Sequence, residues 1–420
     1  MIRRIDIKGF KSLREVVDLN LPQMAVFFGP NTAGKSNLID ALQALSRLAT
    51  CRTLSDALQE PIRGYPAETF SFPSDGLKGL LSQPEAFFEF GATVQVGKGK
   101  EKEQYKYGLR VRILPATGAL SVTDEYLAAL TTQGAIKGNP LIERVQENGK
   151  EELRIRRRGK PAHPRTEPVG LNHTMVSDLR LGDSEYSGIE KCRNEFAGWR
   201  AYYLDPRIAM RRPVPPAEVQ DIGAFGENIA PFLYRLQQTS GRHFEAVKRL
   251  LRTLVPSVEN VTVDLDRQRG TLDVIVRQDG VDFSSRILSE GTLRIMALCA
   301  ITVNPWATPV MGFEEPENGV QPRRIELITN LLCSIALEYK RQLIVTTHSP
   351  LFVASVIKRA QARTDQIGLF NVRRSPAGTQ IEPFDVTGPL FADAAIKETL
   401  TDRGEDGVFE GLALRGMLDE

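Results

Sequence analysis

Short apolar runs alternate with amphipathic stretches along this chain, and the alternation predicts a mixed α/β fold. Residues 25–28, 309–313 and 343–345 are apolar runs with the length and composition of buried strands. After the first run, leucines recur at the spacing of a helix packed along one face, at Leu38, Leu42, Leu45 and Leu48. Ligands of open α/β sheets bind at the carboxyl ends of strands, so functional residues are expected in the segments that follow these runs.

A different pattern occupies the middle of the chain. Residues 107–114 and 119–122 flank a turn at 115–118, and Asn148-Gly149 separates apolar segments at 142–146 and 153–155, so we predict antiparallel hairpins. Residues 159–187 are rich in proline, glycine and polar side chains and are predicted to form a loop.

Helical spacing returns at residues 229–236 and 244–254, followed by a hairpin at 261–263 and 272–276. A last strand is predicted at 367–372 and a helix near 392–400. About 250 residues separate Ser36 from Ser289, and they contain no sustained heptads, so no long coiled coil is expected.

The first apolar run leads into a glycine-rich loop, Gly29-Pro-Asn-Thr-Ala-Gly-Lys-Ser36. Gly29 and Gly34 permit the close backbone approach by which successive N–H groups surround phosphate oxygens. In such a loop Lys35 reaches the β- and γ-phosphates, and the Ser36 hydroxyl binds Mg²⁺. The alternative is a chance glycine-rich turn, which the position between a strand and a helix disfavours.

The second run leads into two acids, in Met311-Gly-Phe-Glu-Glu-Pro-Glu-Asn-Gly319. At the end of a buried strand, Glu314 is a candidate for holding Mg²⁺ through its water shell, and Glu315 for polarising an attacking water. Paired acids on a loop are usually only solvated. The apolar strand before them and Pro316 after them favour the catalytic interpretation.

Two further motifs are weaker by themselves. In Leu288-Ser-Glu-Gly-Thr292, Ser289 precedes a helix and is at least an N-cap. His348, in Val345-Thr-Thr-His-Ser-Pro350, follows the third run and is a candidate γ-phosphate contact. Its alternative is a hydrogen-bonded core histidine.

The four motifs together, in this order, resemble the SMC/RecF-type branch of the ABC ATPases. The resemblance is strongest to small predicted AAA-family ATPases related to OLD-family heads. It is carried by the four motifs, by Ile5-Asp-Ile-Lys-Gly-Phe-Lys-Ser12 and by Gly226-Glu-Asn-Ile-Ala230, and covers roughly residues 1–50 and 225–370. The resemblance implies an ABC-type P-loop ATPase head of two lobes and a mixed sheet, with an inserted α+β region.

The same resemblance assigns site residues and cofactors. ATP and Mg²⁺ would be bound by Gly29, Asn31, Gly34, Lys35, Ser36, Asn37 and Glu314, with Glu315 as catalytic base and His348 as switch histidine. Heads of this type dimerise head to tail, so Ser289 and Gly291 would contact the nucleotide of the partner subunit. Glu314 and Thr292 depart from the commonest residues, and Arg63 resembles an arginine loop or is a plain surface arginine.

Four segments are predicted along the chain. Residues 1–95 form the first part of the head, 96–225 the insertion, 226–375 a helical region with the second part of the head, and 376–420 the C-terminal tail. The tail is short and its acids have no metal-site spacing, so we expect no nuclease domain of the OLD type.

Composition agrees with an intracellular protein. The hydrophobic content of 41% supports a large core, and the four cysteines have no paired spacing, which argues against disulfides and zinc. The chain starts directly in a predicted strand, and its longest apolar run is too short to span a bilayer, so we expect a cytoplasmic protein without a signal peptide.

One stretch could bind a polyanion, Arg154-Ile-Arg-Arg-Arg-Gly-Lys160, with Arg165 nearby. The alternative is a solvated strand whose charge is balanced by Glu143, Glu147, Glu151 and Glu152. Arg207, Arg211 and Arg212 form a weaker patch that could face the nucleotide or the dimer partner.

Three functions remain for an enzyme that hydrolyses ATP slowly as a homodimer or higher even oligomer. It could be a switch or clamp on nucleic acid or a partner protein. It could be an antiphage-defence scaffold or sensor that holds and releases a separate effector, a nuclease or toxin. A transporter subunit is disfavoured by the gap length and by the degenerate signature.

Overall fold

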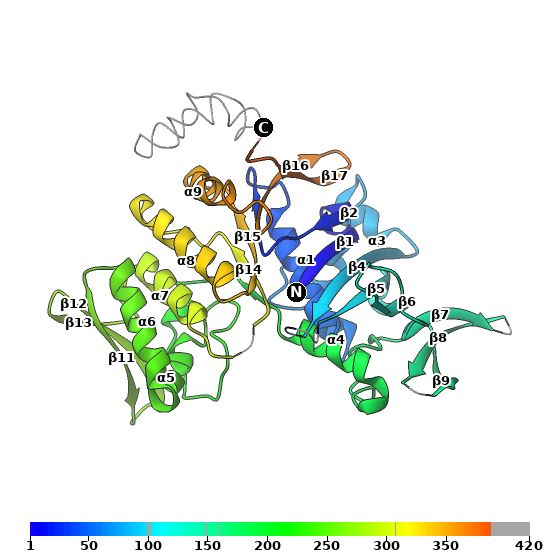
Figure 1. The fold of residues 1–420 in the computed structure, drawn as a ribbon, viewed down its shortest axis with the longest axis horizontal. Helices are drawn as coiled ribbons and strands as arrows, with labels where there is room; N and C mark the ends of the chain where they lie inside the picture. Colours follow the sequence, from blue (N-terminus) through cyan, green and yellow to red (C-terminus); the bar gives the residue numbers. More distant parts are fainter. Residues whose placement is uncertain (98, 100–101, 148, 159, 307, 388–420) are drawn as a thin grey trace. The chain divides into compact units, whose positions relative to one another are not determined.

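The structure, a computed structural model, describes residues 1–97, 99, 102–147, 149–158, 160–306 and 308–387 (Figure 1). The chain divides into two compact units, each discontinuous in sequence. Unit 1 contains Met1–Pro22, Asn31–Trp199 and Asn371–Glu382, and unit 2 contains Gln23–Pro30, Arg200–Phe370 and the described residues from 383 to 387. The four predicted segments are continuous stretches, so this division does not bear on their boundaries and they stay a prediction.

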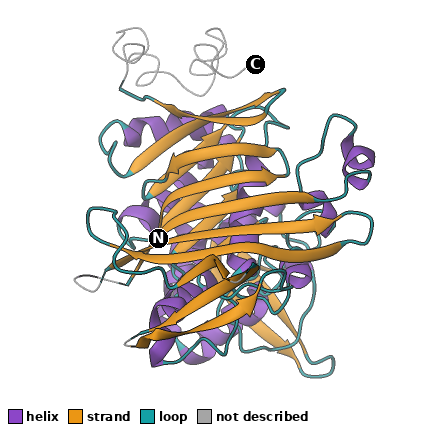
Figure 2. Ribbon diagram, turned by 90° about the vertical axis from the view of Figure 1, so that its right-hand side faces the viewer, coloured by secondary structure: helices purple, strands orange, loops and turns teal. Residues whose placement is uncertain are grey.

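Unit 1 is built on an eight-stranded sheet in the order β2-β1-β4-β5-β6-β7-β8-β9. All neighbouring strands are antiparallel, as predicted for the middle of the chain. The strands are β1 (Ile2–Phe10), β2 (Leu13–Asn20), β4 (Ala86–Val96), β5 (Glu103–Leu114), β6 (Ala119–Leu130), β7 (Ile142–Glu147), β8 (Lys150–Arg157) and β9 (Lys160–Pro168). Figure 2 shows its longest strands lying side by side.

Alternation of buried and exposed residues explains why these segments are strands. In β5, every second residue from Tyr105 to Ile113 is buried, because neighbouring side chains of a strand point to opposite faces. On the buried face, four aromatic rings pack with centroids 4.9–5.6 Å apart: Phe10, Phe70, Phe88 and Phe90. The described part of unit 1 also contains the α-helices α1 (Lys35–Leu48), α2 (Leu54–Ala57), α3 (Gly76–Leu81) and α4 (Ser187–Ala197).

The prediction of a loop at residues 159–187 was wrong in its first part. Lys160–Pro168 forms β9 at one edge of the sheet, although it contains Pro161, Pro164 and Pro168. Proline has no backbone N–H to donate, and an edge strand needs hydrogen bonds on only one side, so prolines are tolerated there. Further along, α4 also begins within the predicted loop, at Ser187.

A six-stranded sheet has the order β10-β14-β15-β3-β16-β17, and its first four strands belong to unit 2. The strands are β10 (Arg200–Tyr202), β14 (Val310–Glu314), β15 (Gln342–Thr347), β3 (Met24–Phe28), β16 (Ile367–Ser375) and β17 (Gly378–Phe384). The first four are parallel to one another, and every residue of β3 and β15 is buried, as expected from their continuous apolar runs. The strands predicted at 309–313, 343–345 and 367–372 are therefore confirmed as β14, β15 and β16.

Unit 2 also contains a three-stranded sheet, β11 (Val258–Asp266), β12 (Thr271–Gln278) and β13 (Val281–Ser284). Its helices are α5 (Ile229–Thr239), α6 (Gly241–Leu254), α7 (Glu290–Thr302), α8 (Ile325–Leu337) and α9 (Pro350–Ala360). The buried positions of α6 are Phe244, Val247, Leu251 and Leu254, which confirms the predicted amphipathic helix. The helix predicted near 392–400 lies outside the described residues.

Candidate functional site

Three parallel strands of unit 2 deliver the candidate motifs to one edge of the sheet. In the register, Phe28 of β3 lies opposite Thr347 of β15, and Thr346 lies opposite Glu314 of β14. The next residues along each strand are Gly29, His348 and Glu315. The start of the glycine-rich loop, the switch-histidine candidate and the acidic pair therefore follow neighbouring strand ends, as ligand-binding loops do in open α/β sheets.

The glycine-rich loop has the backbone geometry that its sequence predicts. Gly29 and Gly34 have φ angles of 152° and 101°, values that residues other than glycine rarely adopt, and Thr32 between them also has a positive φ, of 75°. Lys35 begins α1 and is 5% exposed, while Asn31 is exposed and Ser36 and Asn37 are half-buried. From Asn31 onward these residues belong to unit 1, whereas the acidic pair belongs to unit 2.

Glu315 is the most tightly constrained residue of the acidic loop. Its backbone has a positive φ of 46°, and its N–H donates to the Thr346 carbonyl at 2.9 Å. His348 Nδ1 lies 2.7 Å from Glu315 Oε1, and Asn318 Nδ2 donates to Oε2 at 2.5 Å. Both carboxylate oxygens are thus held in place. The His348 side chain is 40% exposed, so the alternative of a core histidine is wrong.

Glu317 lies in the same loop, and the sequence did not single it out as a site residue. It is 5% exposed, accepts a hydrogen bond from the Thr347 hydroxyl through Oε1, and has no partner for Oε2 within the described residues. Burial raises the pKa of Glu317 to about 7. Only its position two residues after Glu315 could have drawn attention to it.

The signature motif begins α7 and is held by two arginines from residues 205–211. Ser289 caps the helix, accepting from the Thr292 N–H at 3.1 Å, which confirms the N-cap prediction. Arg211 donates to the Leu288 carbonyl at 2.6 Å, and Arg207 pairs with Glu290 at 2.6 Å. Two of the three arginines in the weaker basic patch therefore contact the signature of their own chain.

The signature also touches the acidic loop within unit 2. A Cβ atom on Gly291 would lie 2.6 Å from the Gly319 carbonyl oxygen, so only glycine fits there. One turn further along α7, the guanidinium of Arg294 lies 3.5 Å from the Glu315 carbonyl oxygen. Burial lowers the pKa of Arg294, and the nearby carboxylates of Glu317 and Glu290 oppose that shift.

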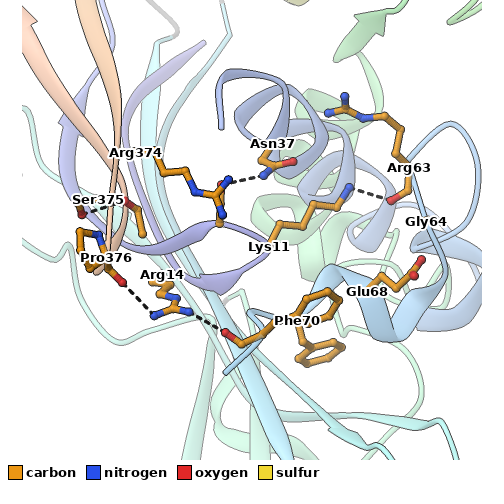
Figure 3. A pocket seen from close by; sticks show the side chains of 13 residues that line it. Lys11, Arg14, Asn37, Arg63, Gly64, Glu68, Phe70, Arg374, Ser375 and Pro376 are labelled. Atoms are coloured by element: carbon orange, nitrogen blue, oxygen red, sulfur yellow. Dashed lines mark hydrogen bonds between the residues drawn. The ribbon is translucent and has the colours of Figure 1, made fainter. Parts of the chain in front are cut away.

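A cationic pocket of 790 Å³ opens beside the first turn of α1 in unit 1 (Figure 3). Its cations are Lys11, Arg14, Arg63 and Arg374, and Glu68 is its one acidic lining residue. Asp40, fully buried on α1, holds Lys11 Nζ at 2.5 Å and the Arg63 guanidinium at 2.9 Å. Arg63 is therefore a fixed part of the pocket wall and not a plain surface arginine.

The basic stretch of the insertion is largely neutralised by neighbouring acids. Arg154 pairs with Glu147, Arg156 with Glu143 and Arg165 with Glu167. Arg157 lies 3.7 Å from Glu185 and donates to the Tyr186 hydroxyl. Glu143 and Glu147 are two of the acids that the solvated-strand alternative named.

Protein ligands for a metal ion are few. The described residues contain no group of three or more histidine, cysteine, aspartate or glutamate side chains placed to hold one. Ser36 and Glu314 offer hard oxygen atoms, and Mg²⁺ at phosphate sites takes one or two protein ligands and completes its shell with phosphates and waters. Each residue, considered within its own unit, therefore suits Mg²⁺ that enters with a nucleotide. Among the described helices, none is long and apolar enough to cross a membrane.

Residues 183–354 match a protein family described as "AAA domain, putative AbiEii toxin, Type IV TA system". This match includes the signature, the acidic loop and His348, and it leaves out the glycine-rich loop. None of the curated proteins compared with this sequence matches it.

Solved structures resemble nearly the whole chain. A crystal structure of an SMC head bound to the C-winged helix domain of ScpA aligns with a TM-score of 0.52, at 15% identity, over 92% of this chain and 98% of that chain. This chain has the fold of an SMC-type ABC ATPase head. The SMC head domain from Pyrococcus yayanosii aligns at a lower TM-score of 0.47, with 12% identity, over 92% of this chain and 97% of that chain. The SMC head domain from Thermotoga maritima aligns at 0.42, with 16% identity, over 91% of this chain and 99% of that chain. No coiled coil interrupts the described part of this SMC-type head.

Proposed function

We propose that this SMC-type head binds and hydrolyses ATP, and that hydrolysis switches it between two states with different affinity for a partner. The observation that carries the proposal is the parallel-strand edge of unit 2. There Glu315 follows β14, and the glycine-rich loop follows β3, with β15 between these two strands. His348 and Asn318 hold the Glu315 carboxylate. The pocket beside α1 supports the proposal, because Arg14 and Arg374 line it in addition to Lys11 and Arg63, the two cations that pair with Asp40, and arginines suit phosphate groups.

Each residue has a defined task in this mechanism. Lys35 and the N–H groups at the start of α1 bind the phosphates, and the wall around Lys11 and Arg63 receives the rest of the nucleotide. Ser36 would help to hold Mg²⁺, which when bound would supply positive charge to neutralise the phosphates. Glu315 orients and polarises the attacking water, because His348 and Asn318 fix its two oxygens.

The switch requires a second subunit. Ser289 and Gly291 would contact the nucleotide of the partner copy, giving a homodimer or a higher even assembly. The exposed surroundings of the signature support this arrangement. Ile208 and Ile287 are 74% and 69% exposed. Ile208 lies next to Arg207, and Ile287 lies next to Leu288. The Arg207–Glu290 and Arg211–Leu288 contacts hold these two segments together.

A partner protein is the better-supported target of the switch, because the basic stretch is already paired with acids. In a fold relative, the SMC head is bound to a domain of ScpA. The alternative of an antiphage-defence scaffold, releasing a separate effector, has the same molecular basis and differs in the partner. The match of residues 183–354 to a family described by a toxin name favours testing it.

Two substitutions test the ATPase proposal. Glu315→Gln keeps the shape of the side chain and removes its basicity, so we expect turnover to fall about 100-fold or more, with ATP affinity changed by less than about threefold. Lys35→Ala should abolish ATP binding. Turnover is measured by phosphate release, and assembly state by light scattering with and without Mg-ATP.

The matched control is Glu326→Gln, an exposed glutamate on α8, which should leave turnover unchanged. Glu315→Gln should also accumulate the ATP-bound dimer. Wild-type turnover in Glu315→Gln would contradict the assignment of the base.

A further inference from the structure

Side-chain hydroxyls form a continuous hydrogen-bonded chain around the glycine-rich loop. Asn37 Nδ2 donates to Ser12 Oγ at 2.7 Å, Ser12 Oγ lies 2.7 Å from Thr379 Oγ1, and Thr379 Oγ1 donates to the Ala33 carbonyl at 2.9 Å. The chain thus starts in the first turn of α1 and ends within the loop. Its members come from three separate parts of the sequence.

Donor and acceptor counting fixes the direction of every bond in this chain. A hydroxyl has one hydrogen to donate. The hydrogen of Thr379 goes to the Ala33 carbonyl, which can only accept, so Thr379 must accept from Ser12. Ser12 has then used its hydrogen and accepts from the Asn37 amide. Each polar group has a role that no other group in the chain can take over.

Packing against the loop adds to these bonds. Thr379 is 4% exposed on β17, and its N–H donates to the Ser12 carbonyl at 2.9 Å. A Cβ atom on Gly34 would lie 2.1 Å from Thr379 Oγ1 and 2.5 Å from Ser12 Oγ. The two hydroxyls therefore occupy the space that any other residue at position 34 would need.

The same hairpin forms one wall of the cationic pocket. Arg374 and Ser375 at the end of β16, Pro376 in the turn and Gly378 at the start of β17 line the pocket. Figure 3 shows the first three of these residues at the pocket. Ser375 Oγ donates to the Gly378 carbonyl at 3.0 Å and closes the turn, and Arg14 donates to the Pro376 carbonyl at 3.4 Å. The turn is thereby fixed to β2.

We propose that Thr379 and Ser12 are positioning residues for the glycine-rich loop, which makes the C-terminal β16–β17 hairpin an integral part of the nucleotide site. The proposal rests on the proposed function, since it concerns the loop that binds the phosphates. Loss of the Thr379 hydroxyl leaves the Ala33 carbonyl without its side-chain donor and releases Ser12 from its fixed orientation. The loop N–H groups then lose the arrangement that surrounds phosphate oxygens.

The test compares one substitution that removes the Thr379 hydroxyl with another that keeps it. Thr379→Val keeps the branched shape and removes the donor, so we expect the KM for Mg-ATP to rise about 5- to 50-fold, with kcat changed less than about twofold. Thr379→Ser keeps the hydroxyl and should retain most of the wild-type affinity. Thr117→Val, at an exposed turn of the same unit, is the matched control.

A second variant guards against simple misfolding. Ser12→Ala breaks the chain at another bond, so the double variant Thr379→Val/Ser12→Ala should weaken ATP binding less than the product of the two single effects. Melting temperatures without nucleotide identify a general loss of stability.

Two results would overturn the proposal: an unchanged KM in Thr379→Val, or equal impairment of the valine and serine variants. If wild-type protein neither binds nor hydrolyses Mg-ATP, the proposed function itself fails. An active wild type together with an unaffected Thr379→Val refutes only the positioning role.

Discussion

Two neighbouring carboxyl groups of the acidic loop have opposite surroundings. Glu315 has a partner on each oxygen, His348 and Asn318. Glu317 is buried with a partner on one oxygen only, among the described residues. A buried carboxyl with incomplete hydrogen bonding resists ionisation, which is why the pKa of Glu317 is raised to about 7.

This difference predicts how stability depends on pH. The pKa of Glu317 rises from an ordinary 4.5 to about 7 on folding, so between these values the folded protein holds a proton that the unfolded chain releases. Its contribution to the free energy of unfolding therefore falls as pH rises from about 5 to above 7, by up to about 3 kcal/mol. Glu317→Gln is neutral at every pH and should be more stable than wild type at pH 8 but not at pH 5.

Thermal unfolding of both proteins across this pH range measures the effect. Glu259→Gln, at an exposed strand position, serves as the control. A Glu317→Gln variant that is less stable than wild type at pH 8 would show that the ionised carboxylate has a partner in the folded protein.

At the residue level, the sequence predicted the backbone positions of residues that depend only on their immediate neighbours in the chain. Gly34, Lys35, Glu315 and Ser289 occupy the backbone positions expected of them, because each depends on its own strand, loop or helix start. Thr379 could not be found in this way. It contacts Ala33 across 346 positions of sequence, and no local periodicity specifies such a contact.

Among the elements, α7 has the most closely supported N-terminus. Arg211 binds the carbonyl of Leu288 from 77 residues away, in addition to the Ser289 cap. Arg207 forms an ion pair with Glu290, but its side chain is 76% exposed, so solvent screening leaves it a small contribution.

We therefore expect Arg211 to matter more than its neighbours. Arg211→Ala removes a charge-assisted hydrogen bond worth about 1.5–3 kcal/mol and loosens the signature, so ATP-dependent dimerisation should weaken about tenfold or more. Arg207→Ala should weaken it by no more than about fivefold. Arg212→Ala, at an exposed adjacent position, is the control. Sedimentation in the Glu315→Gln background gives the dimer constants, and equal effects of all three substitutions would contradict the ranking.

Elements were predictable where one pattern dominated them. The buried runs of β3, β14 and β15 and the amphipathic α5 and α6 follow directly from apolar spacing. β9 was missed because its three prolines suggest a loop, and only its place at the sheet edge makes them compatible with a strand. β17 was missed because exposed residues such as Glu382 interrupt its apolar pattern.

At the scale of the whole molecule, neither unit is a continuous piece of sequence. The six-stranded sheet has β3, from residues 24–28, between β15 and β16. A fragment limited to the family-matched residues 183–354 lacks that strand, and β15 would lose the partner on one side. Residues 183–354 are therefore a region of sequence similarity to the family and do not include all strands of the sheet to which they contribute.

Charge across the molecule bears on the partner class. The net charge is +2, and much of the basic stretch is engaged in ion pairs. Few cations there are available to displace counterions from a phosphate backbone. We expect Glu315→Gln with Mg-ATP to bind duplex DNA weakly, with the logarithm of the binding constant falling by less than about 2 per tenfold increase in salt.

A labelled duplex titrated over a salt series, with and without Mg-ATP, provides the measurement. Steep, ATP-dependent weakening with salt would instead mean that the basic stretch exchanges its acids for phosphates. The nucleic-acid clamp would then replace the partner-protein switch as the leading proposal.

The hydroxyl chain around the glycine-rich loop also has a thermodynamic consequence. A loop that is already folded has little conformational entropy left to lose when a nucleotide arrives. Calorimetry should therefore find a smaller unfavourable entropy of Mg-ATP binding in the wild type than in Thr379→Val. Thr379, on the β16–β17 hairpin, would then determine how much of the free energy of ATP binding remains available to close the dimer.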